Sequence, residues 1–151
     1  MFIIFKSRSC LLFALVFLLN SLKAQDLSLE GYTIFAINTT DSSNQNISVA
    51  NNLKFALKFS SNPTTGYDWY FTNITYETTK NLVEFLNLDQ YGGGQYQAAS
   101  TGLLGSGGYT YFLLESAANK TGEVDLEFIY KRIWETNGQQ DKKGVNIKVG
   151  S

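Results

Sequence analysis

Apolar and polar side chains alternate with a period of two along three segments, and this alternation is the strongest constraint on how the chain can fold. Residues 53–60, 124–131 and 145–149 each place an apolar side chain at every second position. Successive side chains of a β-strand point to opposite faces of a sheet, so each segment is predicted to be a strand with one buried face. No segment repeats its apolar residues with the 3.6-residue period of a long amphipathic helix. The pattern therefore predicts an all-β fold.

Four weaker segments add to these strands. Residues 32–38, 67–73 and 82–88 are short and apolar, although 82–88 also fits helical turns. Residues 109–114 are aromatic or apolar at every position except Thr110, which predicts a strand covered on both faces. Because turns rich in Asn, Gly, Ser and Thr separate these segments and no helices alternate with them, a two-sheet sandwich or a barrel is expected. We favour an antiparallel β-sandwich of about seven to eight strands.

The first 24 residues have the organisation of a secretory signal peptide. Lys6 and Arg8 precede an apolar run over 10–19, and the small Ala24 ends the segment. The run is shorter than the roughly 18 apolar residues that a membrane span needs, although an uncleaved anchor is the alternative. We expect cleavage after Ala24 and one mature domain, residues 25–151, that does not associate with membranes.

Export bears on the cysteine chemistry, the location and the glycosylation of the mature domain. The only cysteine, Cys10, lies within the predicted signal, so the mature domain has no thiol and no disulfide. Its location is expected to be extracellular or in the lumen of the endosomal and lysosomal pathway. Asn62-Pro63-Thr64 has the spacing of an N-glycosylation site, but the proline in its middle position prevents glycosylation. Four other Asn-x-Ser/Thr triplets are possible glycosylation acceptors, at Asn38, Asn46, Asn73 and Asn119.

The composition excludes most chemistry. The chain has no histidine, which removes Ser-His-Asp and Cys-His catalysis and the commonest metal ligand. Paired carboxylates would remain, but Asp125 and Glu127 lie on the solvent face of a predicted strand. A formal net charge of −1 without a basic cluster argues against a nucleic-acid partner. We therefore expect neither enzymatic activity nor a metal or cofactor site.

A short segment after the 53–60 strand combines stiffness with a turn. Pro63, the only proline, fixes its own φ, and Gly66 permits the positive φ that closes a turn. Thr64 and Thr65 between them are β-branched and therefore stiff at χ1. The segment is predicted to be a rigid projecting loop, with an ordinary hairpin turn as the alternative.

Two later segments have the composition of binding loops. A long polar connection that starts near Asp89 ends in a glycine-rich stretch at 102–108. Leu103 and Leu104 in this stretch are expected to be buried either by a binding partner or by the protein's own core. Arg132 and Trp134 follow the 124–131 strand, and these residue types are enriched in binding hot spots. The alternative for the tryptophan is that it caps the end of the core. In a Greek-key sandwich, loops of this kind emerge at one end.

The three segments together resemble the signature of the chagasin family of cysteine peptidase inhibitors. That signature is Asn-Pro-Thr-Thr-Gly-Tyr, then Gly-x-Gly-Gly, then Arg-Pro-Trp, and it occurs here in the same order, with Ile133 in place of the last proline. The resemblance extends from about residue 32 to 149. The matching residues, with the leucine beside them, are Asn62, Pro63, Thr64, Thr65, Gly66, Tyr67, Leu104, Gly105, Ser106, Gly107, Gly108, Arg132, Ile133 and Trp134.

The resemblance implies an immunoglobulin-like sandwich and a monomeric, reversible, non-covalent inhibitor of papain-like cysteine proteases. Three adjacent loops would occlude the active-site cleft, with Thr64 over the catalytic residues and Trp134 on the primed side. Arg132 would offer charge-assisted hydrogen bonds there. The alternative from another class is a secreted carbohydrate-binding or adhesion module. Its stacking residues would be Tyr91, Tyr96, Tyr109, Tyr111 and Trp69.

Overall fold

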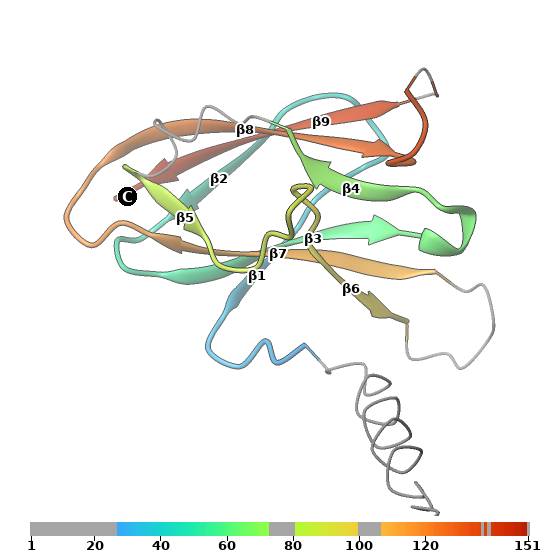
Figure 1. Ribbon diagram of the computed structural model, residues 1–151. Helices are drawn as coiled ribbons and strands as arrows, with labels where there is room; N and C mark the ends of the chain where they lie inside the picture. Colours follow the sequence, from blue (N-terminus) through green and yellow to red (C-terminus); the bar gives the residue numbers. More distant parts are fainter. Residues whose placement is uncertain (1–26, 73–80, 100–106, 137, 139, 151) are drawn as a thin grey trace, which may run out of the picture.

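The computed structural model describes residues 27–72, 81–99, 107–136, 138 and 140–150, and the predicted signal peptide lies outside this range. These residues form nine strands and one 3-10 turn, and none of their helical segments is long and apolar enough to cross a membrane. The strands pack as two layers (Figure 1). Their bounds are β1 Thr33–Ala36, β2 Gln45–Val49, β3 Lys54–Ser61, β4 Asp68–Phe71, β5 Val83–Phe85, β6 Gln95–Ala98, β7 Gly108–Ser116, β8 Gly122–Lys131 and β9 Asp141–Val149.

The first sheet has the order β1-β3-β7-β5, with β6 also paired to β7, and the second has the order β2-β9-β8-β4. The predicted β-sandwich is therefore confirmed, with nine strands rather than seven to eight. Both sheets are mixed, because β1 pairs parallel with β3 and β2 pairs parallel with β9. The chain passes from β1 directly to β2 in the other sheet, so no hairpin joins either edge strand to its neighbour and imposes antiparallel pairing.

The three segments with a period of two are strands β3, β8 and β9, and their apolar faces meet in the core. Phe59 on β3, Phe112 on β7 and Phe128 on β8 are completely buried. Their ring centroids lie 5.5 Å apart for Phe59 and Phe112, 4.8 Å for Phe59 and Phe128, and 4.7 Å for Phe112 and Phe128. Complete burial of such a side chain contributes about 1.5–3 kcal/mol. These rings therefore hold the two sheets together.

A smaller apolar cluster covers the outer face of the first sheet. Ala56, Tyr111 and Leu113 point away from the main core but are buried, and Leu27 and Leu29 pack against them. The predicted cover on both faces is thus confirmed for residues 110–114, where the outer cover comes from the segment before β1, but not for Tyr109, which is exposed. This explains why β7 shows no alternation of apolar and polar residues.

A buried lysine anchors the connection between β1 and β2. The side chain of Lys143 on β9 is 2% exposed, and its ammonium donates hydrogen bonds to the Asp41 carboxylate at 3.0 Å and to the Ser43 carbonyl oxygen at 2.5 Å. A hydrogen bond from the Ser43 hydroxyl, followed by that from Lys143, lowers the pKa of Asp41 below its usual value. The three residues fasten this connection to the second sheet.

A carboxylate joins the two sheets beneath the loop that follows β3. Oδ1 of Asp68, the first residue of β4, accepts hydrogen bonds from the hydroxyl groups of Ser61 at 2.8 Å and Thr110 at 2.5 Å. Both hydroxyl donors are on buried residues of the first sheet, whereas Asp68 belongs to the second. Nearby, the Trp69 indole donates to the Ser60 carbonyl oxygen at 3.0 Å. These bonds fix the end of the sandwich from which the loop projects.

Substituting Asp68→Ala is expected to destabilise the fold by about 2–3 kcal/mol, because the buried hydroxyls of Ser61 and Thr110 lose their acceptor. The free energy of unfolding in urea measures this loss. Asp141→Ala is the matched control, since Asp141 is an exposed residue on a strand of the same sheet. Equal stability of the two variants would contradict the assigned role of the carboxylate.

Candidate binding site formed by three loops

The loop after β3 folds as a tight turn. Pro63–Thr65 form a 3-10 turn, and Gly66 adopts a φ of 82°, with its N–H donating to the Pro63 carbonyl oxygen at 2.8 Å. Asn62 before the proline has a φ of −136° and a ψ of 79°. The conformations predicted for the proline and the glycine are therefore both present. We call residues 62–67 the first loop.

Side chains inside the first loop hold one another. The Thr64 hydroxyl donates to the side-chain oxygen of Asn62, and the Thr65 hydroxyl donates to the Asn62 carbonyl oxygen at 2.8 Å. Thr64 and Thr65 are nonetheless exposed at the tip. The loop consequently has few rotamers left to lose when another surface covers it.

The loop after β8 forms a second turn, with two apolar side chains at its tip. The backbone N–H of Glu135 donates to the Arg132 carbonyl oxygen at 3.1 Å, which closes the turn around Ile133 and Trp134. The side chain of Trp134 is 68% exposed and that of Ile133 is 39% exposed. Trp134 therefore does not cap the core, and the alternative reading of this residue is wrong. We call residues 132–135 the third loop.

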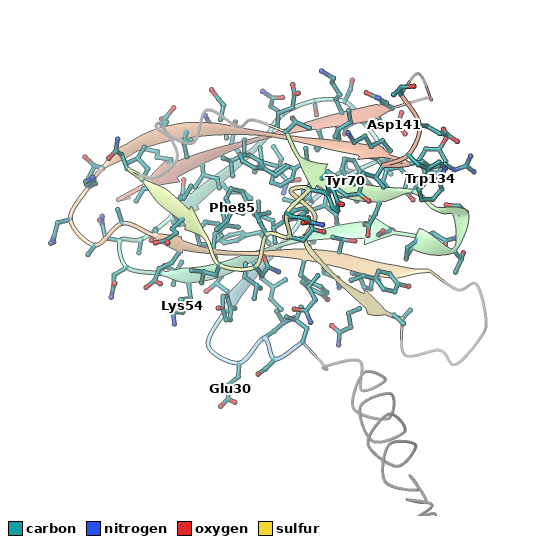
Figure 2. All side chains as sticks on the ribbon, in the orientation of Figure 1. Glu30, Lys54, Tyr70, Phe85, Trp134 and Asp141 are labelled. Atoms are coloured by element: carbon teal, nitrogen blue, oxygen red, sulfur yellow. The ribbon has the colours of Figure 1, made fainter. Side chains whose placement is uncertain are left out.

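The first and third loops are in direct contact. A β-carbon added to Gly66 would lie only 2.5 Å from Cη2 of Trp134, so the indole occupies the space that a side chain at 66 would fill. Nε of Arg132 donates to the Thr65 carbonyl oxygen at 3.0 Å, and its guanidinium lies 4.6 Å from the centre of the Tyr67 ring. Trp134 lies at the end of the sandwich where the turn between β3 and β4 projects (Figure 2).

The predicted second loop is described only at its base. Leu104, Gly105 and Ser106 lie outside the described residues, whereas Gly107 and Gly108 are placed at the start of β7. Gly108 pairs with Ser61 at the end of β3. A β-carbon on Gly107 would lie 3.2 Å from the Ser61 carbonyl oxygen and 3.8 Å from Cβ of Asn62. The bases of the first and second loops are therefore adjacent.

A column of aromatic rings supports the first and third loops. Tyr67 lies 5.5 Å from Tyr130, Tyr130 lies 5.1 Å from Trp69, and Trp69 lies 4.9 Å from Phe59 in the core. The Tyr130 hydroxyl also accepts a hydrogen bond from the backbone N–H of Asn62 at 3.4 Å. Stacked rings of this kind hold the two loops on a rigid base.

Sequence reasoning missed two residues of this site. Tyr130 was read only as part of an alternating strand, and its contact with the first loop depends on the pairing of β4 with β8. Glu135 was not among the predicted site residues, although an acidic residue three positions after Arg132 is a usable signal for an ion pair. Both residues act inside the site rather than at its exposed tip.

The aromatic residues of the carbohydrate-binding alternative do not form one exposed platform. Trp69 and Tyr111 are buried, so their ring faces are not available to a sugar. The ring of Tyr109 is occupied by the Lys58 ammonium, 3.7 Å from its centre. Within the described part of the chain, no group of three His, Cys, Asp or Glu side chains is arranged to hold a metal ion.

The sequence of the chain matches the model of one known protein family. The model of the chagasin family of peptidase inhibitors, I42, matches residues 46–149, and the chain therefore belongs to this family. The protein is thus a cysteine protease inhibitor and not an enzyme. No curated protein sequence matches the chain significantly.

Three solved structures are similar to the chain. The crystal structure of the cysteine protease inhibitor EhICP2 from Entamoeba histolytica is 18% identical with a TM-score of 0.50, and the match covers 76% of this chain and 95% of that chain. The solution structure of amebosin is 25% identical with a TM-score of 0.46, over 78% of this chain and 97% of that one. PbICP-C, solved in complex with falcipain-2, is 17% identical with a TM-score of 0.46, over 77% and 98%.

Substituting Gly66→Ala is expected to displace Trp134, because the new methyl group would occupy the volume of the indole. Gly31→Ala is a matched control: Gly31 also has a positive φ, of 81°, but a β-carbon there meets no atom within 4 Å. Both variants bear the roughly 1 kcal/mol cost of an alanine in the left-handed region. Only Gly66→Ala should change the emission maximum of tryptophan fluorescence. A similar change in Gly31→Ala would contradict the packing of Trp134 on Gly66.

Proposed function

We propose that this protein inhibits papain-like cysteine proteases reversibly and without covalent reaction, by inserting three adjacent loops into the active-site cleft. The observation that carries the proposal is the contact between the first and third loops, with Trp134 exposed beside Gly66 and Arg132 bonded to Thr65. A single rigid surface that spans two loops fits a groove on another protein better than two independent tips do.

The exposed residues suggest how the surface is used. Thr64 and Thr65 would lie over the catalytic residues of the protease, and Trp134 would pack on an apolar surface to one side. Residues 104–108 would follow the cleft on the other side. Protease–inhibitor pairs typically bury about 800 Å² on each partner. Three loops of about five residues each supply much of that area.

Preorganisation favours tight binding. The internal hydrogen bonds of the first loop and the aromatic column beneath it already restrict the side chains that would be ordered on docking. When little entropy is lost on association, more of the contact energy remains as affinity. Because the chain has no histidine and its only cysteine is Cys10, it offers the protease no thiol or imidazole from the mature domain with which to form a bond.

Substituting Trp134→Ala is expected to weaken inhibition of papain by about 2 kcal/mol or more, roughly 30-fold, because a large exposed aromatic anchor is removed. Tyr91→Ala is the matched control, since Tyr91 is 62% exposed but lies outside the three loops. Deletion of residues 63–65 should weaken inhibition further. Inhibition constants measured by papain titration of residues 25–151 test all three variants. Unchanged inhibition by Trp134→Ala and by the deletion would refute the loop assignment.

We also propose that the chain is exported as a monomer after removal of residues 1–24. Leu27 and Leu29 already pack on the first sheet, so the packed domain starts just after the expected cleavage site. Asn119 is the acceptor best suited to a glycan, because it is exposed in the turn between β7 and β8. That turn lies at the far end of β7 from Gly108, about 26 Å away at 3.3 Å per residue. By contrast, the Asn38 amide donates to the Asp41 carboxylate at 3.0 Å.

Expression of the full chain in secreting eukaryotic cells is expected to release a protein that begins at Gln25. Asn119→Gln should remove one enzymatically cleavable glycan while leaving papain inhibition unchanged, because the site is remote from the loops. Mass spectrometry of the secreted protein identifies its first residue and the glycan on Asn119, and a papain titration measures inhibition. Retention of residues 1–24, or the same glycan mass in the variant, would contradict the proposal.

A further inference from the structure

We infer that Glu135, together with Arg132, forms a clasp that positions Trp134, and that Glu135 is therefore a positioning residue for protease binding. The clasp consists of the Arg132 guanidinium, the Glu135 carboxylate and the Thr65 carbonyl oxygen. Glu135 lies outside the three sequence motifs of the binding loops. The inference rests on the proposed function, because the clasp affects inhibition only through the loop surface.

The ion pair closes the third loop. Nη1 of Arg132 lies 2.7 Å from Oε1 of Glu135, and the backbone N–H of Glu135 bonds to the Arg132 carbonyl oxygen at 3.1 Å. The same two residues are thus joined through both side chain and backbone. A charge-assisted hydrogen bond of this length is stronger than a neutral one. Consistent with this, the hydrogen bond that Arg132 donates to the Glu135 carboxylate raises the pKa of Arg132 above its usual value.

The same guanidinium also reaches the first loop. Its Nε donates to the Thr65 carbonyl oxygen at 3.0 Å, and its plane lies over the Tyr67 ring at 4.6 Å. Three contacts, two of them to another loop, therefore set the orientation of one planar group. A lysine ammonium has no planar fork and cannot reproduce this combination. Glu135 holds the guanidinium from the third loop while Thr65 and Tyr67 hold it from the first.

Trp134 lies inside the turn that the clasp closes. Its indole packs on Gly66, on the same loop that Arg132 contacts through Thr65. Ile133 precedes it and, unlike proline, does not fix its own φ. The restraint on this turn must therefore come from contacts, and the Arg132–Glu135 ion pair and the hydrogen bond that closes the turn supply them. The clasp thus takes over the stiffening that a proline at 133 would provide.

The first test uses the free protein, without a protease. Trp69 is buried and Trp134 is exposed, and the chain has only these two tryptophans, so quenching by acrylamide, which is neutral and therefore insensitive to the charge of Glu135, reports mainly on Trp134. Glu135→Gln keeps the shape of the side chain but removes its charge, and we expect the quenching constant to rise by about half or more as the indole leaves Gly66. Glu127→Gln is the matched control, because it removes a surface ion pair between Glu127 on β8 and Lys142 on β9, away from the third loop. An unchanged constant in Glu135→Gln would overturn the clasp.

The second test measures papain inhibition in a double-mutant cycle. Glu135→Gln is expected to raise the inhibition constant about fivefold to tenfold, while Glu127→Gln leaves it unchanged. In an Arg132→Ala background, Glu135→Gln should add no further loss, because its effect acts through the guanidinium. Raising NaCl from about 0.05 to 0.5 M should narrow the gap between wild type and Glu135→Gln, since the ion pair is partly exposed and screened by salt.

Additive losses in the cycle, or wild-type inhibition by Glu135→Gln, would overturn the positioning role. These outcomes are distinct from failure of the proposed function, which is tested by Trp134→Ala. If Trp134→Ala inhibits like the wild type, the loop surface is not the binding surface, and the quenching experiment still decides whether the clasp holds the indole. If Trp134→Ala loses inhibition and Glu135→Gln does not, only the positioning role fails.

Discussion

The packing of Phe59 between the two sheets is the contact on which the rest of the structure depends. Its buried ring meets Phe112 and Phe128 in the core and Trp69 toward the loops. The strands that carry the three phenylalanines are also those that border the loops, since β3 leads into the first, β7 follows the second and β8 leads into the third. The relative position of the loops is therefore set by how these rings pack, before any contact between the loops forms.

Polar contacts carry this order from the core to the surface. The Asp68 carboxylate ties the ends of β3 and β7 to β4 just beyond the aromatic core. Tyr130 then supports the first loop from below, and the Arg132 guanidinium links it to the third. Each layer is more exposed than the one beneath it, yet each has fixed partners. This chain of contacts from the core to the surface allows a small domain without disulfides to hold its loops in fixed conformations.

The predictable part of the fold was the part with alternating side chains. Strands β3, β8 and β9 each turn an unbroken apolar face to the core and a more polar face away from it, so the pattern identifies them. Strand β6 falls in a segment that the sequence predicts to be a long loop. Its four residues have no buried face, so no alternation of apolar and polar side chains indicates a strand there. The expected antiparallel sheets were also wrong at two edges, where β1 pairs parallel with β3 and β2 pairs parallel with β9. Both are edge strands whose partners come later in the chain, so no local pattern reveals the direction of pairing.

The sequence by itself determined the all-β class, the stiffness of the first loop and the absence of histidine, with Cys10 as the one thiol. These properties depend on residue types and on neighbours within a few positions, which a single chain reveals. Only the tertiary structure decided that Gly66 leaves room for Trp134 and that Arg132 bonds to Thr65. Those partners lie 67 or 68 positions apart, and they meet because the pairing of β4 with β8 brings the first and third loops to one end of the second sheet. Which residues of the two loops meet depends on the register of this strand pairing, and no local sequence pattern specifies that register.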